Sequence, residues 1–256
     1  MSKCIYNKNG TREWFLNGNI RHRDDGPAIE SDNGLSIWYY NDQLHRLDGP
    51  AIKYCDGSEE WFINGKRHCA NGPAIKYCDG SEEWYFEGIR HRNDGPAVTF
   101  INGTNFWYYK GKKHRLDGPA IVYCDGTKQW YFHGKKHRVE GPAVEYFNGS
   151  SEWYYNGLKH RYKEPALDYV NGRKEWWLFG ERNRLDGPAL IQWGGYTEYW
   201  FAGKLIDSYK YYSIVYIWKK YYSKISNILY KKYKTFLDAH FYNVSSAIVK
   251  YLIFLS

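Results

Sequence analysis

Three residue types that could do chemistry recur at one fixed interval in this sequence. Histidine returns every 23 residues at seven positions, which are His22, His45, His68, His91, His114, His137 and His160. An arginine follows most of these histidines, and tryptophan keeps the same interval at Trp38, Trp61, Trp84, Trp107, Trp130, Trp153 and Trp176. Imidazoles can ligate metal ions, guanidinium groups can bind phosphates, and indole rings can stack on bases.

The spacing favours structural roles for all three columns. If the repeat is a hairpin, equivalent residues lie two strands apart, near 10 Å, whereas zinc ligands must lie about 2 Å from one ion. We therefore expect each histidine to hydrogen-bond its own turn. An acidic residue usually follows the arginine by two positions, and we expect a local pair that stabilises the turn; the acids are Asp25, Asp48, Asp117, Glu140 and Asp186. A tryptophan present in every unit indicates packing.

The repeat itself is marked by Gly-Pro-Ala. This tripeptide occurs at 26–28, 49–51, 72–74, 95–97, 118–120, 141–143 and 187–189, and Glu164-Pro165-Ala166 fills the missing slot. Asn183 takes the place of the eighth histidine, and Trp14 and Trp200 stand one residue out of step at the two ends. The sequence predicts a repeat domain over residues 1–203 and a different segment over residues 204–256.

Each unit contains the signals of a β-hairpin. The stretch from Ala51 to Tyr54 alternates as a strand does, and Asp56-Gly57 can supply the positive φ values of a tight turn. Residues 58–63 form the expected return strand, and Asn64-Gly65 marks a second turn. The predicted fold is therefore mainly β: an elongated single antiparallel sheet of stacked hairpins with a helical C-terminal element. Repeated aromatic side chains would stabilise the contacts between neighbouring hairpins.

The pattern Trp-Tyr-x-x-Gly-Lys-x-His, followed by Tyr-x-Asp-Gly-Ser or Thr, resembles the MORN repeat. The best matching stretches are residues 107–127 and 130–149. The chain is a variant, because arginine follows the histidine and the second glycine lies in Gly-Pro-Ala; this variant is similar to repeats of large DNA viruses, phages and YwqK-type antitoxins. The resemblance implies an elongated β-sheet module that scaffolds, oligomerises or sits at acidic membranes.

Composition first suggests nucleic acid, because the chain is 20% aromatic and carries a formal charge of +8. Residues 204–256 account for +7 of that charge, however, and most aromatic residues belong to the repeat. Basic and aromatic character therefore belong mainly to different parts of the chain, which makes a nucleic-acid partner an alternative and not the leading interpretation.

The cysteines and the N-terminal sequence predict an intracellular protein that is not secreted. Five cysteines at 4, 55, 69, 78 and 124 form no CxxC pair and no zinc-ligand spacing. The first residues contain no apolar stretch of the kind that a secretory signal has. The apolar stretch 241–255 is shorter than the ~20 residues of a membrane-spanning helix.

Catalytic residues should be local departures from a repeat, supported by partners. The irregular positions Glu164, Asn183 and His133 form no nucleophile, base or phosphate loop. We therefore expect a protein that is not an enzyme and has no cofactor, metal or small-molecule substrate.

Residues 204–256 predict a basic amphipathic helix over 208–236 and a second helix after Asp238. One face is apolar, and the other carries Lys219, Lys220, Lys224, Lys231 and Lys234. Three interpretations remain open: a cap on the end of the sheet, a helix on an anionic membrane, or a docking helix for a protein partner.

These observations predict a non-enzymatic repeat scaffold that mediates protein–protein interaction or self-association. A peripheral membrane adaptor acting through 204–256, an antitoxin-like inhibitor and a single-stranded nucleic-acid binder are the alternatives.

Overall fold

The computed structural model describes residues 2–8, 10–184, 186–213 and 216. The chain divides into two compact units, Met1–Lys135 and Lys136–Ser256. Each unit is built of short antiparallel strands, and the described residues include one short helix near the C-terminus. The prediction of a mainly β, antiparallel fold is confirmed. No helix in the described part of the chain has the length and apolar character needed to span a membrane.

Almost all strands are two residues long, because turns interrupt the chain at short intervals. In the first unit they are β1 (Lys3–Tyr6), β2 (Thr11–Leu16), β3 (Ile20–Arg21), β4 (Ile29–Ser31), β5 (Ser36–Ile37), β6 (Tyr39–Tyr40), β7 (Gln43–Leu44), β8 (Ile52–Lys53), β9 (Glu59–Glu60), β10 (Phe62–Ile63), β11 (Lys66–Arg67), β12 (Ile75–Lys76), β13 (Glu82–Glu83), β14 (Tyr85–Phe86), β15 (Ile89–Arg90), β16 (Val98–Thr99), β17 (Asn105–Phe106), β18 (Tyr108–Tyr109), β19 (Lys112–Lys113), β20 (Ile121–Val122), β21 (Lys128–Gln129) and β22 (Tyr131–Phe132).

The same alternation continues after the first unit. β23 (Lys135–Lys136) lies at the boundary, and the second unit contains β24 (Val144–Glu145), β25 (Ser151–Glu152), β26 (Tyr154–Tyr155), β27 (Leu158–Lys159), β28 (Leu167–Asp168), β29 (Lys174–Glu175), β30 (Trp177–Leu178), β31 (Glu181–Arg182), β32 (Leu190–Ile191), β33 (Thr197–Phe201) and β34 (Lys204–Ile206).

One antiparallel ladder runs through each unit. In the first unit β8 pairs with β9, β9 with β12, β12 with β13 and β13 with β16, so each strand joins a neighbour in its own repeat and one in the next. In the second unit β24 pairs with β25, β25 with β28, β28 with β29 and β29 with β32. Because the repeats have the same length of 23 residues, the strands of each repeat pair in the same register.

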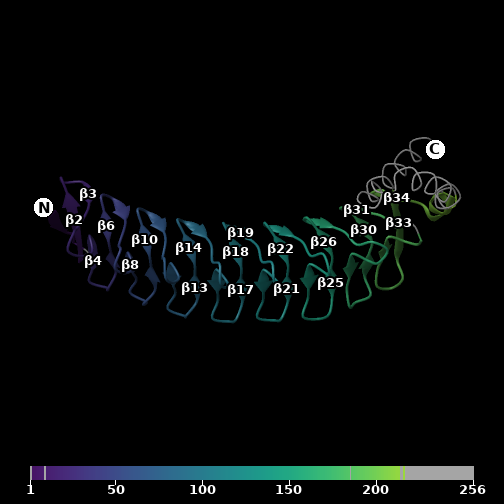
Figure 1. Cartoon of the computed structure of the whole chain (residues 1–256), viewed down its shortest axis with the longest axis horizontal. Helices are drawn as coiled ribbons and strands as arrows, with labels where there is room; N and C mark the ends of the chain where they lie inside the picture. Colours follow the sequence, from purple (N-terminus) through teal and green to yellow (C-terminus); the bar gives the residue numbers. More distant parts are fainter. Residues whose placement is uncertain (1, 9, 185, 214–215, 217–256) are drawn as a thin grey trace. The chain divides into compact units, whose positions relative to one another are not determined.

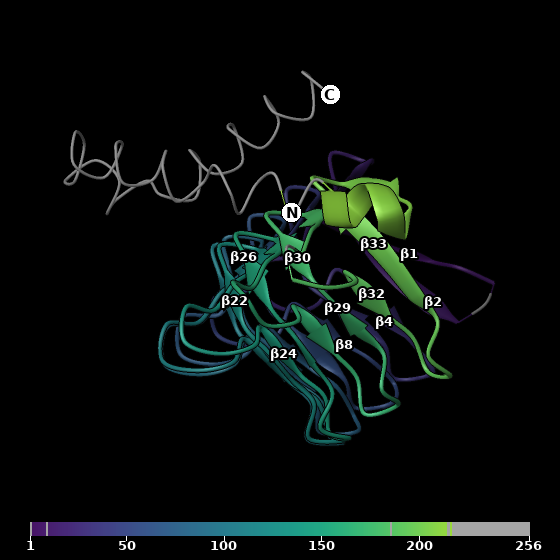
Figure 2. The same ribbon diagram turned by 90° about the vertical axis from the view of Figure 1, so that its right-hand side faces the viewer.

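Each repeat also forms a second, smaller hairpin. The chain leaves the ladder at the tryptophan and makes a two-stranded hairpin, such as β10–β11 or β14–β15. Figure 1 shows these hairpins of the first unit as a row above the ladder strands β8, β13 and β17. Figure 2 shows the same separation in the second unit, with β26 and β30 apart from β24, β29 and β32.

The two turns of a repeat differ in geometry. The ladder hairpin closes with the Tyr54 N–H donating to the Ser58 carbonyl at 2.9 Å, and Gly57 has a φ of 89°. Asp56 has no positive φ, contrary to the prediction, and its carboxylate accepts the Ser58 N–H at 2.8 Å. In the small hairpin, Asn64 and Gly65 both have positive φ, at 49° and 73°, as a two-residue turn of the primed type requires.

The core is a thin layer under the ladder. The alanines of the repeated tripeptide are completely buried, and each is followed by a buried or half-buried aliphatic residue; the alanines are Ala28, Ala51, Ala74, Ala97, Ala120, Ala143, Ala166 and Ala189. Since a single layer of small hairpins buries little apolar surface, the remaining stabilisation must come from polar and aromatic contacts between repeats.

The sequence places Trp14 and Trp200 one residue out of step with the tryptophan column, and the structure shows that only Trp14 belongs to it. The Trp14 N–H donates to the Ala28 carbonyl at 2.9 Å, as Trp38 does to Ala51, so Trp14 belongs to the column and the extra residue lies in the turn 17–19. At the other end, the Arg184 N–H donates to the Trp200 carbonyl as Arg161 does to Trp177. Trp200 is therefore equivalent to Trp177, and Tyr199 takes the place of the column tryptophan.

The C-terminal helix begins where the sequence predicts. Residues 208–213 are helical, and Asp207 caps them by accepting the Lys210 N–H at 2.8 Å. Tyr211 is completely buried; its hydroxyl donates to the Arg184 carbonyl at 2.6 Å and accepts the Gly187 N–H at 3.1 Å. This first turn covers the last repeat. Residues 214–215 and 217–256, which include Lys219, Lys220, Lys224, Lys231 and Lys234 of the predicted helices, lie outside the described residues.

Candidate binding surface

Arginine and tryptophan of the same repeat form a stack. The Arg92 guanidinium lies 3.8 Å from the centre of the Trp84 ring. Its Nε donates to Asp94 at 2.9 Å, and its Nη1 donates to the Pro96 carbonyl at 3.3 Å. An aromatic ring, a carboxylate and a carbonyl thus hold this cation, and cation–π contacts of this kind contribute ~0.5–2 kcal/mol.

The stack recurs in both units with distances of 3.8–4.2 Å, at Arg23 on Trp14, Arg46 on Trp38, Arg115 on Trp107, Arg161 on Trp153 and Arg184 on Trp176. The expected arginine–acid pair is present for Asp25, Asp48, Asp117 and Asp186. Arg138 instead pairs with Glu145, not with the expected Glu140. Trp130 follows β21 at the equivalent place in its repeat.

One repeat departs from the column, because Cys69 stands where the arginine would be. The ring of Trp61 in that repeat is approached by the Lys76 ammonium at 5.2 Å. A cation from the following repeat thus partly takes over the missing contact, which indicates that the tryptophan ring is a cation site within the fold.

The Gly-Pro-Ala tripeptide is explained by this stack. A Cβ built on Gly95 would lie 2.9 Å from the Arg92 Cζ, closer than real Cβ contacts, so a side chain there requires either the guanidinium or the local backbone to shift. The proline supplies the carbonyl acceptor, and the alanine fits a completely buried site. Where Glu164 replaces the glycine, the chain changes course: Lys163 takes a φ of 68°, and the Glu164 N–H donates to the Tyr162 carbonyl.

The histidine column stabilises turns, but in the next repeat. The Nδ1 of His91 accepts the Lys110 N–H at 3.2 Å, and Lys110 begins the small turn of the following repeat with a φ of 48°. For His91 the prediction of a hydrogen bond within the histidine's own turn is therefore wrong, whereas His22 also has its Nε2 at 3.0 Å from the Asp24 carboxylate in its own turn. The same Nδ1 bond, to the residue 19 positions later, is made by His22, His45, His68, His114, His137 and His160.

This bond matches one tautomer of the neutral ring, and it helps to hold unusual residues in the turns. An Nδ1 that accepts an N–H carries no proton, so the neutral ring holds its proton on Nε2. Left-handed backbone is costly for side chains such as Glu87 and Phe179, and the bond helps to hold them there. Asn183 does the same with its Oδ1, accepting the Ala202 N–H at 3.2 Å, which is why asparagine can replace the histidine.

A column of buried glutamates has no counterpart among the predicted site residues. Glu60, Glu83, Glu152 and Glu175 directly precede the tryptophan and are buried. Burial opposes the ionisation of Glu152, yet hydrogen bonds from Tyr169, Tyr154 and Tyr146 hold its pKa below the usual range. The signal in the sequence is the dipeptide Glu-Trp, which recurs with a basic residue seven positions after the glutamate.

The basic partners of these glutamates also connect repeats. The Arg67 Nε donates to Glu60 at 2.9 Å, while its guanidinium lies 5.5 Å and 5.7 Å from the rings of Phe62 and Tyr85 in consecutive repeats. Arg90 contacts Glu83, Tyr85 and Tyr108 in the same way. These positive charges of the repeats are therefore committed to contacts within the fold.

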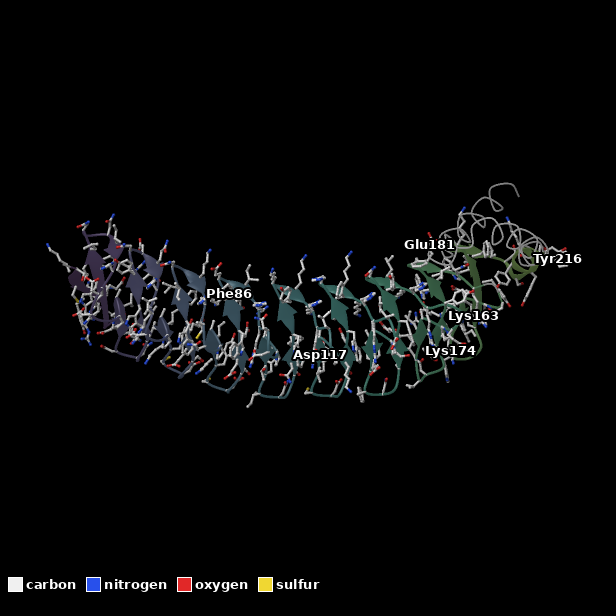
Figure 3. All side chains as sticks on the ribbon, viewed as in Figure 1. Phe86, Asp117, Lys163, Lys174, Glu181 and Tyr216 are labelled. Atoms are coloured by element: carbon white, nitrogen blue, oxygen red, sulfur yellow. The ribbon has the colours of Figure 1, made fainter. Side chains whose placement is uncertain are left out.

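The surface of the first unit is hollowed between two consecutive repeats. The hollow measures about 810 Å³ and is lined by residues 92–95, 107–109, 114–117 and 132–133. Tyr109, Phe132 and Leu116 give it an apolar lining, and Leu116 is 82% exposed. Figure 3 labels Asp117 in the connection that carries this leucine, and Phe86 in the row of small hairpins.

The charged groups of the hollow form two ion pairs. Arg115 donates to Asp117 at 2.9 Å, and Arg92 donates to Asp94 at the same distance. His114 and His133 stack at 4.4 Å, and burial together with the charge of His133 lowers the pKa of His114. In the described part of the chain, no three His, Cys, Asp or Glu side chains are placed to hold a metal ion. The two arginines that line the hollow are therefore paired with carboxylates of their own repeats.

Neither a family model nor a curated protein matches the sequence.

Proposed function

We propose that the chain is a non-enzymatic repeat protein of the MORN type, and that its first unit binds a protein partner through the hollow at Leu116. The observation that carries this proposal is the exposure of Leu116 at the edge of a hollow whose charges are already paired. Leu116, Tyr109 and Phe132 are all exposed, and neighbouring exposed apolar side chains with a polar rim mark sites of protein–protein interaction.

The arginines support a protein partner over a phosphate ligand. Arg92 and Arg115 retain only 22% and 25% side-chain exposure, and each already contacts an indole ring, a carboxylate and a proline carbonyl. A phosphate would have to displace these partners, whereas an apolar side chain would leave them in place. The partner is therefore expected to insert an aliphatic or aromatic side chain between Leu116, Tyr109 and Phe132.

A random peptide library displayed on phage and selected on the immobilised protein tests this proposal. Enriched peptides should share an aliphatic or aromatic anchor residue and should bind the Leu116→Asp variant about tenfold more weakly. Ile101→Asp is the matched control, because Ile101 is an exposed apolar residue on a ladder turn outside the hollow. Absence of enriched peptides, or equal loss in both variants, would contradict the proposal.

A further inference from the structure

The first strand of the first unit presents an open sheet edge. β1 pairs with β2 through four residue pairs, whereas the ladder pairs inside the repeats contain two. Among the described residues β1 has no other neighbouring strand. All four of its residues are exposed, including Ile5 at 48% and Tyr6 at 67%. Exposed edges of this kind are templates for pairing with another strand.

The hydrogen bonds show which backbone groups face outward. The Asn7 N–H donates to the Thr11 carbonyl at 2.8 Å, and Ile5 lies opposite Glu13. Hydrogen-bonded and non-hydrogen-bonded pairs alternate in an antiparallel ladder, so Lys3, Ile5 and Asn7 face β2. The N–H and C=O groups of Cys4 and Tyr6 therefore point away from β2, toward the open edge.

The far end of the second unit is built differently. There the helical turn 208–213 covers the last repeat, and the Tyr211 hydroxyl satisfies the Arg184 carbonyl and the Gly187 N–H. Backbone groups at that end thus have partners supplied by the chain itself. No described residue does the same for the outward groups of Cys4 and Tyr6.

We propose that β1 pairs with β1 of a second copy of this chain, antiparallel, about a two-fold axis through Ile5. In this register Cys4 faces Tyr6 of the second copy and Tyr6 faces its Cys4, so all four outward donors and acceptors of β1 are matched in each copy. Lys3 lies opposite Asn7 and no like charges face each other. This self-complementary edge fits a second copy, as a two-fold interface requires. The proposal is independent of the hollow at Leu116.

Sedimentation of the full-length chain tests the pairing. The wild-type protein should form a dimer, and Tyr6→Pro should raise its dissociation constant at least about tenfold, because proline removes an outward N–H that β2 does not use. Tyr6→Ser is the matched control, since it removes the side chain and keeps the N–H, and it should dimerise nearly as wild type does. A wild-type protein that stays monomeric would overturn the proposal, as would equal weakening by both variants.

A cross-link provides a second readout that does not depend on the proline variant folding. At the two-fold axis Ile5 forms a non-hydrogen-bonded pair with a Cα separation near 4.5 Å, which a disulfide can bridge. With Cys4, Cys55, Cys69, Cys78 and Cys124 changed to serine, Ile5→Cys should therefore form a disulfide dimer under mild oxidation. Ile101→Cys, also exposed, should not do so, and equal cross-linking by both would refute the pairing.

Discussion

At the scale of single residues, one cation determines the chemistry of its surroundings. The guanidinium of Arg92 contacts Trp84, Asp94 and Pro96, and it lies where a Cβ on Gly95 would be. Four positions of the repeat therefore serve one side chain, which explains why they recur together.

Gly95→Ala should destabilise the protein by about 1–2 kcal/mol, because the new Cβ would displace the Arg92 guanidinium from the Trp84 ring and remove the cation–π contact. Gly72→Ala is the matched control: its repeat has Cys69 in place of arginine, and the Cβ would meet the sulfur at an ordinary 3.6 Å. That substitution should change stability by less than about 1 kcal/mol, in either direction. Urea unfolding of the two variants decides, and equal losses would count against the role assigned to the arginine.

The sequence predicts the roles of some repeated residues and not of others. The pair of arginine and aspartate two positions later could be predicted, because both side chains belong to one short segment. The acceptor role of His91 toward Lys110 could not, since the partner lies 19 residues away and depends on how repeats stack. Glu83 was overlooked because a glutamate beside a tryptophan has no turn or metal signature of its own.

At the scale of elements, the small hairpin depends on the repeat before it. Its first turn residue has positive φ, and the N–H of that residue is held by a histidine of the preceding repeat. The bond requires a neutral ring, so protonation removes the acceptor and weakens the contact between repeats.

Stability should therefore fall as the pH drops below 6.5. Burial lowers the pKa of His160, and burial with the charge of His133 lowers the pKa of His114, from the ordinary 6.5. Since the unfolded chain binds these protons first, the stabilisation is complete above 6.5 and is lost as the pH falls through the folded values. Urea unfolding across this range measures it. His160→Asn, which copies the natural replacement at Asn183, should make the free energy of unfolding less dependent on pH. A free energy of unfolding that rises on acidification would disprove the acceptor role of the histidines.

At the scale of the whole molecule, stability is distributed over similar contacts between neighbours. The prediction of antiparallel hairpins succeeded because the 23-residue interval, the turn glycines and the buried alanines all indicate one register. The ends could not be predicted in the same way. In the sequence Trp200 stands one residue out of step with the tryptophan column. In the structure Tyr199 occupies the column position, and the centre of its ring lies 4.8 Å from the centre of the Tyr211 ring.

Removal of residues 49–71 should leave a folded protein. The cut joins Asp48 to Gly72, so Arg46 keeps its stack on Trp38 and the His45 ring meets Glu87 in place of Asn64. Because each repeat contacts mainly its neighbours, we expect a cooperative β protein of moderately lower melting temperature. A deletion of half that length would place a small hairpin against a ladder strand and should prevent folding. Circular dichroism during heating distinguishes the two deletion variants. Loss of β structure on removal of residues 49–71 would contradict the view that each repeat is stabilised mainly by its neighbours.

The equivalence of neighbouring repeats has a consequence for the gene. Tyr54–Trp61 and Tyr77–Trp84 have the same amino-acid sequence, and coding segments that share such repeats would be substrates for misaligned recombination. An exchange in register adds or removes 23 codons and joins surfaces that already fit each other. Copy number can then change in one genetic step without an intermediate that fails to fold, so chain length is a trait that selection can adjust in whole repeats.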